Sequence, residues 1–148
     1  MTYVVYQLFS EKYLKELLSA ILHIMHVSFW GKVKKGAHRG RLLGFPTANI
    51  ALHKKIPEGI YTSTIRVDKN NFSAATFIGS VKTFNEKDYK AETYILDFAK
   101  DIYGKWIIIT LLKKIRDNKK FTGEKELVNQ MKKDIEEVRK YFQKNTNS

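Results

Sequence analysis

The most informative absence from the 148-residue chain is that of cysteine. A chain without cysteine has neither a disulfide framework nor a thiolate metal site. A histidine-based zinc site is also unsupported, because the spacings of His23, His26, His38 and His53 match no common ligand pattern. The lack of cysteine fits a reducing compartment, and we expect a cytoplasmic protein.

Runs of basic residues are absent as well, although the formal net charge is +12. No block of five or more consecutive basic residues occurs, and the lysines are spread over every segment. This distribution is typical of a solvated surface, so we expect no nucleic-acid partner. A positive field would still attract an anionic nucleotide.

Only one long apolar stretch is present, Leu17–Trp30, and His23, His26 and two serines interrupt it. It is too short to span a bilayer. Lys12 and Lys15 in front of it imitate a signal peptide, but no small-residue cleavage site is evident. We therefore expect no membrane association, and a monomer that acts on small molecules.

What the chain does contain is enough apolar sequence for one folded domain. Its residues are 43% hydrophobic and 13% aromatic, and 148 residues can bury a sizeable core. From Val27 to about Thr110, short β-rich runs alternate with Gly, Pro and Asn, which is typical of a small antiparallel sandwich or barrel. Asp68–Asn71 is typical of a hairpin turn and Asn85–Lys90 of a polar connector. The expected strands are Val27–Lys34, Thr47–Leu52, Gly59–Val67, Ser73–Val81, Glu92–Phe98 and Lys105–Leu112.

Helical patterns flank the β-rich region on both sides. Ser10 can cap a helix from about Glu11 to His26, which packs on the barrel, is the remnant of a linker or binds a partner. Thr122 can cap a second helix from about Glu124 to Phe142, whose apolar residues recur at helical spacing. We expect a disordered tail at residues 143–148.

The loop Gly40–Ile50 is suited to ligand contact. Two of its residues are glycines, which let the backbone approach a ligand closely, and Pro46 holds the preceding residue extended. Thr47 and Asn49 follow two apart, so an extended chain points both to one face and offers a hydroxyl and an amide oxygen to Mg²⁺ or a phosphate. Composition alone favours an ordinary Gly/Pro turn that enters a strand.

The run Gly-Arg-Leu-Leu-Gly-Phe-Pro-Thr-Ala-Asn resembles the signature of the riboflavin kinase family, including the kinase half of bacterial bifunctional FAD synthetases. The resemblance covers about residues 27–142. Lys82 stands where relatives commonly have proline, which removes some rigidity from that loop. The further blocks, in the family's order, are Pro57–Tyr61, Phe77–Gly79 with Thr83 and Phe84, Glu92–Phe98, Asp101–Gly104, Ile115–Arg116 and a C-terminal Leu-x-x-Gln-x-x-x-Asp-Ile helix.

The resemblance implies a fold and an activity. The fold is a mainly-β, six-stranded antiparallel Greek-key barrel with a C-terminal helix packed on it and an N-terminal helical segment. The activity is transfer of the γ-phosphate of ATP to the ribityl 5′-hydroxyl of riboflavin, with Mg²⁺, to give FMN and ADP. We divide the chain into an extension at 1–26, a kinase domain at 27–142 and the tail at 143–148, without an adenylyltransferase domain. The alternatives are a non-catalytic flavin- or nucleic-acid-binding barrel and the kinase portion of a longer FAD synthetase.

The resemblance also implies roles for individual residues. Thr47 and Asn49 bind the Mg²⁺ of the nucleotide, and Glu92 is the general base that accepts the ribityl hydroxyl proton. Strand alternation places Glu92 on the same side as Tyr94, where position alone favours a strand-end residue that reaches water. The residues implied in binding the substrates are Gly36, Arg41, Gly44, Thr47, Asn49, Tyr103, Gly104 and Arg116.

Several of these assignments have structural alternatives. The loop Lys34–Gly44 would cradle phosphates, or else be a surface hairpin. Arg116 meets flavin or phosphate, or forms a surface salt bridge. We expect Asp97 and Asp101 to be structural. The candidate walls for the isoalloxazine ring are Phe84, Tyr89 and Trp106, although aromatic residues are more often core.

Overall fold

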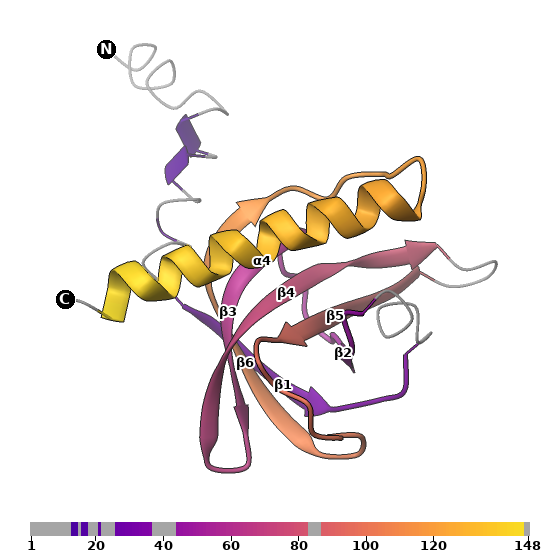
Figure 1. Ribbon diagram of the computed structural model, residues 1–148, viewed down its shortest axis with the longest axis vertical. Coiled ribbons are helices and arrows are strands. Elements are labelled where there is room, and N and C mark those ends of the chain that lie inside the picture. Colours follow the sequence, from indigo (N-terminus) through magenta and orange to yellow (C-terminus); the bar gives the residue numbers. More distant parts are fainter. Residues whose placement is uncertain are drawn as a thin grey trace, which may run out of the picture.

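The described part of the protein consists of six strands and a C-terminal helix, with further helical residues before the first strand. Figure 1 shows the computed structural model, which describes residues 13–14, 16–17, 21, 26–36, 44–82 and 87–146. The predicted mainly-β fold with a C-terminal helix is confirmed. No helix in these ranges is both long and apolar enough to cross a membrane. The elements are β1 Val27–Lys32, β2 Thr47–Ala51, β3 Gly59–Val67, β4 Asn70–Lys82, β5 Lys87–Ile95, β6 Trp106–Arg116 and α4 Glu124–Thr146.

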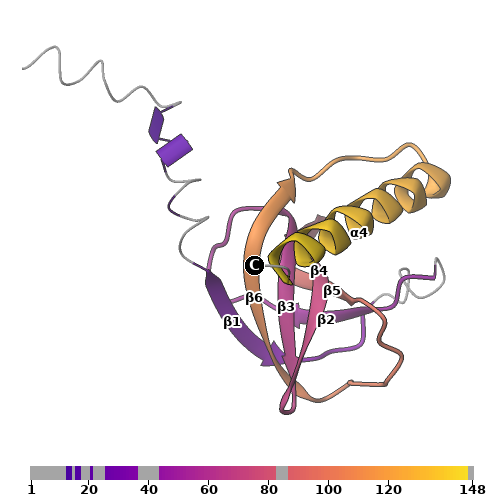
Figure 2. The same ribbon diagram turned by 60° about the vertical axis from the view of Figure 1, so that its left-hand side comes forward.

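The helix predicted at residues 11–26 is described at only a few positions. Residues 13–14, 16–17 and 21 are helical, and the other residues up to 25 lie outside the described ranges. Tyr13, Leu14, Leu17 and Ile21 are each at least 42% exposed. In Figure 2 these residues precede β1 and lie outside the barrel. The described side chains therefore do not pack on the barrel, which was one of three options for this segment.

The six strands form one antiparallel sheet in the order β1-β6-β3-β4-β5-β2. β3, β4 and β5 are consecutive neighbours, and β6 returns beside β3, which is a Greek key. The two ends of the sheet approach each other: the Lys34 amide donates to the Asn49 carbonyl at 2.8 Å. Gly31 also lies against Ile50, whose Cβ would be 3.2 Å from a Cβ at Gly31. The predicted Greek-key architecture is thus confirmed, as a partly open barrel.

Alternate residues of the strands line the interior of this barrel. Ile50, Ile65, Ile78, Ile107 and Ile109, from four different strands, are at most 1% exposed. Residues between them in the strands point to the outer face. Burying each such side chain stabilises the fold by about 1.5–3 kcal/mol. Because these side chains fill the interior, a ligand can bind only to the outer face of the strands or to the loops.

Three hydroxyl groups form a hydrogen-bonded chain inside the apolar interior. Ser63 Oγ lies 2.7 Å from Thr76 Oγ1, which lies 2.9 Å from Thr93 Oγ1, and all three residues are 0% exposed. Ser63 Oγ also donates to the Ala74 carbonyl at 3.1 Å. A hydroxyl has one proton to donate. Thr76 therefore donates to Ser63, and Thr93 donates to Thr76.

We expect Thr76→Val to lower the free energy of unfolding by about 1–3 kcal/mol, measured by urea denaturation. The substitution keeps the shape of the side chain but leaves the Ser63 oxygen without its donor and the Thr93 hydroxyl without its acceptor. Thr64→Val, at a partly exposed position of β3, is the matched control, with an expected change within about 0.5 kcal/mol. Equal losses in both variants would contradict a specific role for the hydroxyl chain.

The helix α4 packs on the outer face of β3 and β4 (Figure 1). Its first helical hydrogen bond runs from the Leu127 amide to the Gly123 carbonyl, so Gly123 is the N-cap rather than Thr122. Thr122 still fixes the helix start, because its amide and hydroxyl both donate to Glu126 Oε2 at 3.0 Å. Hydrogen bonds from Lys119 and Thr122 lower the pKa of the Glu126 carboxyl to about 2.

Several predicted boundaries are wrong, among them those of β4, β5, β6 and α4. β5 begins at Lys87, inside the predicted connector, because its backbone pairs with β4 although the residues at its start are polar. The helix α4 continues to Thr146, where the tail was predicted to be disordered. The Thr146 hydroxyl donates to the Phe142 carbonyl at 2.6 Å and supports this last turn. Residues 147–148 of the tail lie outside the described ranges.

Candidate active site

Three of the predicted site residues lie on the outer face of the β2–β5 strand pair. Thr47 and Asn49 of β2 are directly opposite Tyr94 and Glu92 of β5. Directly opposite residues of an antiparallel pair point to the same side of the sheet. Ile50, 1% exposed, faces the interior, so its neighbour Asn49 and the residues in line with Asn49 face outward. We call Thr47, Asn49 and Glu92 the β2–β5 site.

The side chain of Asn49 is held in place by its own strand and by the segment after β1. Asn49 Nδ2 donates to the Thr47 carbonyl at 3.1 Å, and Asn49 is only 9% exposed. Gly36 covers it: a Cβ at Gly36 would lie 2.4 Å from Asn49 Nδ2 and 2.7 Å from its Cγ. Gly36, predicted to approach a nucleotide, therefore contacts the β2–β5 site through Asn49.

Glu92 forms an ion pair that the sequence interpretation missed. Lys90 Nζ lies 2.6 Å from Glu92 Oε1, and the two side chains are 21% and 30% exposed. Both residues are on the outer face of β5, because they are two positions apart in a strand. Phe77 of β4 lies opposite Glu92 on its other side. The spacing Lys-x-Glu within a strand was the signal that could have predicted this pair.

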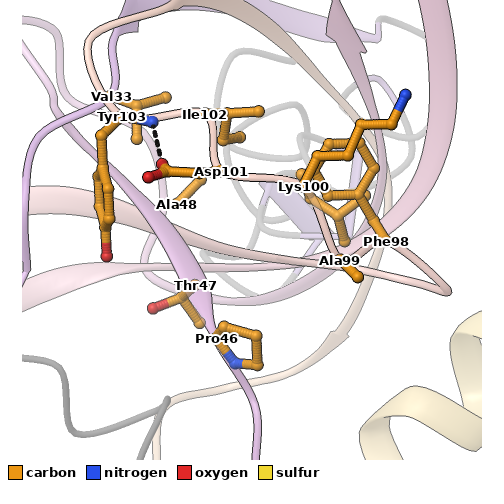
Figure 3. Close-up of a pocket in the computed structure, with 11 residues that line it drawn as sticks. Val33, Pro46, Thr47, Ala48, Phe98, Ala99, Lys100, Asp101, Ile102 and Tyr103 are labelled. Atoms are coloured by element: carbon orange, nitrogen blue, oxygen red, sulfur yellow. Dashed lines mark hydrogen bonds between the residues drawn. The ribbon is translucent and has the colours of Figure 1, made fainter.

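A pocket of about 400 Å³ opens next to Thr47, between the start of β2 and the turn that follows β5. Figure 3 shows Tyr103 extending from this turn towards Thr47. The walls of this pocket are mostly apolar, and the hydroxyl of Thr47 lies at one of its edges. Its lining residues are Val33, Pro46, Thr47, Ala48, Ile95, Phe98, Ala99, Lys100, Asp101, Ile102 and Tyr103.

The turn that carries Tyr103 is fixed by Asp101 and Gly104. Asp101 Oδ1 accepts a hydrogen bond from the Tyr103 amide at 2.9 Å, shown dashed in Figure 3. Gly104 has φ +75°, which favours glycine, and its amide donates to the Val33 carbonyl at 2.9 Å. Asp101 is therefore structural, as predicted, and it positions Tyr103 at the pocket.

Gly44, a predicted substrate-binding residue of the loop before β2, has a conformational role. Its φ is +85°, and a Cβ there would meet nothing within 4 Å, so backbone conformation rather than space calls for glycine. Phe45 follows, and its ring meets that of Tyr94 edge to face, with centroids 5.5 Å apart. Arg41 lies outside the described residues, and its contact with a nucleotide stays a prediction.

Arg116 is engaged by the helix rather than directed at the β2–β5 site. Its Nε and Nη2 donate to the two carboxylate oxygens of Asp134 at 2.9 and 2.7 Å, and its Nη1 donates to the Asp117 carbonyl at 3.0 Å. These contacts favour the salt-bridge alternative for Arg116. Asp97 is also structural, since Arg139 donates to both of its oxygens. That hydrogen bonding holds the pKa of Asp97 below its usual range.

Two of the aromatic residues suggested as walls for a flavin ring, Tyr89 and Trp106, lie in the described part of the chain. The Tyr89 hydroxyl accepts from the Ile56 amide and donates to the Ile56 carbonyl, so Tyr89 anchors the chain between β2 and β3. Trp106 is on the outer face of β6, and its register partner Lys32 is two residues before Lys34, which pairs with Asn49. Its exposure of 61% contradicts the core alternative for Trp106, and the flavin-wall suggestion stays a prediction. Phe84 lies outside the described residues.

Comparison with known proteins finds relatives that match about three quarters of the chain. The chain is 38% identical over 118 residues to the bifunctional riboflavin kinase/FMN adenylyltransferase of Bacillus subtilis (strain 168), covering 76% of this chain and 37% of the relative. The chain spans less than half the length of the bifunctional relatives that it matches.

Two solved structures share the fold. A protein of Streptococcus pneumoniae described as a macrolide-efflux protein matches with a TM-score of 0.71 and 34% identity, over 77% of this chain and 38% of its own. The riboflavin kinase of Trypanosoma brucei matches with a TM-score of 0.56 and 29% identity, over 79% of this chain and 80% of its own.

The family model for riboflavin kinase, Flavokinase, matches residues 24–142. This range contains all six strands and most of α4, together with every residue of the β2–β5 site. The chain therefore belongs to the riboflavin kinase family.

Proposed function

We propose that this chain is an ATP-dependent riboflavin kinase, which transfers the γ-phosphate of ATP to the ribityl 5′-hydroxyl of riboflavin and yields FMN and ADP. The observation that carries the proposal is the convergence of Thr47, Asn49 and Glu92 on one outer face beside a pocket. Phosphoryl transfer asks for positioning and charge neutralisation, with a group that orients or deprotonates the attacking hydroxyl. The kinase domain proposed at residues 27–142 falls within the range of the family match.

Glu92 is the proposed general base. A carboxylate that is part exposed on an open strand face can accept a proton from a hydroxyl held within hydrogen-bond reach. Lys90, 2.6 Å from Glu92 Oε1, fixes one oxygen of this carboxylate, so the other oxygen can meet the ribityl hydroxyl. Phe77 of β4 is the register partner of Glu92, and its ring offers an apolar surface on the side where the flavin would approach.

Thr47 and Asn49 are the proposed protein ligands of Mg²⁺. Their side chains carry a hydroxyl and an amide oxygen, which are hard neutral ligands that suit this ion. Asn49 Nδ2 faces Thr47 Oγ1 at 3.5 Å, so the amide would turn to bring its oxygen to the same ion. The described residues contain no group of three or more His, Cys, Asp or Glu side chains that could hold a metal. The fit is therefore to an ion that takes its remaining ligands from phosphates and water. When bound, Mg²⁺ neutralises charge on the β- and γ-phosphate oxygens.

The pocket beside Thr47 is the proposed site of the adenine ring. Its size of about 400 Å³ lies in the range of small-molecule sites, and its walls are mostly apolar. Tyr103 supplies an aromatic face at the end where Thr47 would hold the metal and phosphates. Lys34 and Lys35 are exposed on the segment that crosses Asn49, and they would attract the polyphosphate.

The proposed surroundings of the enzyme follow from its composition. The absence of cysteine supports a reducing compartment such as the cytoplasm. We propose that the kinase acts on its two small-molecule substrates as a monomer.

The direct test incubates the full chain with riboflavin, ATP and Mg²⁺ and separates riboflavin, FMN and FAD by chromatography. FMN and an equal amount of ADP are expected, and omission of either ATP or Mg²⁺ should abolish both. If a folded protein binds riboflavin but forms no FMN, the binding-module alternative replaces the proposal.

We expect Gly36→Ala to lower kcat/KM for FMN formation by about tenfold or more. The added methyl group overlaps the Asn49 amide and displaces it from its place beside Thr47, and misplacement by about 1 Å can reduce a rate by up to about 10²-fold. Gly123→Ala is the matched control, because a Cβ there meets nothing within 4 Å. Equal activity of the two variants would show that the position of Asn49 is unimportant.

A further inference from the structure

The only two tryptophans of the chain lie together on the outer surface of β1 and β6. Trp30 of β1 and Trp106 of β6 are 68% and 61% exposed, and their ring centroids are 5.4 Å apart. Ile108, 40% exposed, is the register partner of Trp30. β1 and β6 lie side by side at the left of Figure 2. We call Trp30, Trp106 and Ile108 the tryptophan face, and an exposed aromatic cluster of this kind marks a binding surface.

The charged residues around the tryptophan face are positive. Lys32 is the register partner of Trp106, and Arg66 of β3 is the register partner of Ile108, and both are exposed. Neither β1, β3 nor β6 contains an aspartate or a glutamate. Arg66 Nε has one long hydrogen bond, 3.4 Å, to the Asp68 carbonyl.

The carboxylates that follow these strands are already paired. Asp68, directly after β3, has Lys105 Nζ 2.6 Å from its Oδ2. Asp117, directly after β6, has Lys114 Nζ 2.5 Å from its Oδ1. The surface therefore combines exposed aromatic rings with cations and offers no unpaired carboxylate along the three strands that form it.

We propose that the tryptophan face binds single-stranded nucleic acid. Trp30 and Trp106 each stack on a base, and the nucleotide sequence does not matter because every base has a π-face. Lys32 and Arg66 flank the rings and neutralise phosphates of the same strand. The tryptophan face shares no residue with the β2–β5 site, and its test reads oligonucleotide binding rather than FMN formation, so the proposal does not depend on kinase activity. It replaces our expectation of no nucleic-acid partner, which considered runs along the chain and not residues that the sheet register brings together.

The test titrates the full chain with a short oligouridylate at low salt and follows tryptophan emission. Both tryptophans are in the proposed surface, so saturable quenching is expected. For two phosphate contacts, a plot of the logarithm of the association constant against the logarithm of the salt concentration should have a slope of about −1.4. Oligothymidylate is the second arm: equal affinity supports stacking plus backbone contacts, and preference for uridine supports added contact with the 2′-hydroxyl.

Variants locate the binding through the anisotropy of a labelled oligouridylate. Trp30→Ala and Trp106→Ala should each weaken binding by about 5- to 150-fold, the range that corresponds to the loss of one stacked base. Trp30→Phe should keep part of the affinity that Trp30→Ala loses. Lys32→Ala should weaken binding and reduce the salt slope, whereas Lys133→Ala, an exposed lysine of α4, should do neither. Circular dichroism checks that each variant is folded.

Three results would overturn the proposal. The first is no quenching by either oligonucleotide at low salt. The second is unchanged affinity in a Trp30→Ala/Trp106→Ala variant, which would place binding on scattered lysines instead. The third is tryptophan emission that iodide cannot quench in the free chain, because the tryptophan face would then be covered by residues 1–26 or by a second copy.

Discussion

Glu92→Gln is expected to lower kcat for FMN formation by at least about a hundredfold, because general-base catalysis contributes about 10²–10⁴. Glutamine has the shape of glutamate and still accepts a hydrogen bond, but it cannot take the proton of the ribityl hydroxyl. The side chain is part exposed and contributes nothing to the barrel interior, so the variant should fold and bind riboflavin. The measurement is the rate of FMN formation at saturating riboflavin and ATP.

Two controls separate loss of the base from other effects of Glu92→Gln. The first is Glu137→Gln, the same change on an exposed helix residue, which should leave the rate unchanged. The second addresses Lys90, which loses its ion-pair partner in the variant. If the unpaired lysine caused the loss, Lys90→Gln/Glu92→Gln would recover the rate. An unchanged rate in Glu92→Gln itself would leave the kinase in place and remove Glu92 as its base.

The fold was predictable where local signals and the sheet agreed. β3 has the predicted bounds, because Gly59 begins it directly after Pro57-Glu58 and the Asp68-Lys69 turn ends it. β5 was predicted five residues too late, since a start of Lys-Asp-Tyr-Lys carries no apolar alternation. Backbone pairing with β4 makes this segment a strand regardless of its side chains. Hydrophobic periodicity detects a buried face and misses a strand whose end is polar on both faces.

The candidate site was predictable in its composition and less so in its contacts. Thr47 and Asn49 share a face because they are two apart in a strand, and this needed no structure. The pairing of Asn49 with Glu92 is a matter of register between β2 and β5, which are far apart in sequence. Gly36 was predicted to contact the nucleotide, and its neighbour in the protein, Asn49, could not be read from the sequence. Local sequence thus gives the residue types, and register decides which of them meet.

The same distinction explains why the burial of some aromatic and polar residues could not be predicted from the sequence. Trp106 was considered core or a flavin wall, because large aromatic residues are usually buried. Its place on the outer face of β6 follows from the alternation with Ile107 and Ile109, which fill the interior. Conversely, Thr76 and Thr93 look like surface residues in the sequence but lie at 0% exposure, where each finds a hydroxyl partner.

Arg116→Met is expected to lower the free energy of unfolding by about 3–5 kcal/mol, the cost of removing one partner of a buried ion pair. Asp134 is 5% exposed, and Arg116 supplies two of its hydrogen bonds. In the variant, Asp134 keeps the hydrogen bond from Gln130 Nε2, which lies 3.0 Å from its Oδ1. This donor is neutral and does not balance the buried negative charge. Urea denaturation measures the loss. Arg116→Met/Asp134→Leu should recover most of it, because the double variant buries no unpaired charge.

This pair also decides between the two roles considered for Arg116. If Arg116 acts only through Asp134, Arg116→Met and Asp134→Asn should both destabilise the protein, and the folded fraction of each should keep its KM for riboflavin and ATP. If the guanidinium also binds a substrate, Arg116→Met should raise one KM while Asp134→Asn does not. The three contacts to Asp134 and Asp117 occupy Nε, Nη1 and Nη2 together, so the first outcome is expected. A raised KM in Arg116→Met alone would restore Arg116 to the substrate-binding residues.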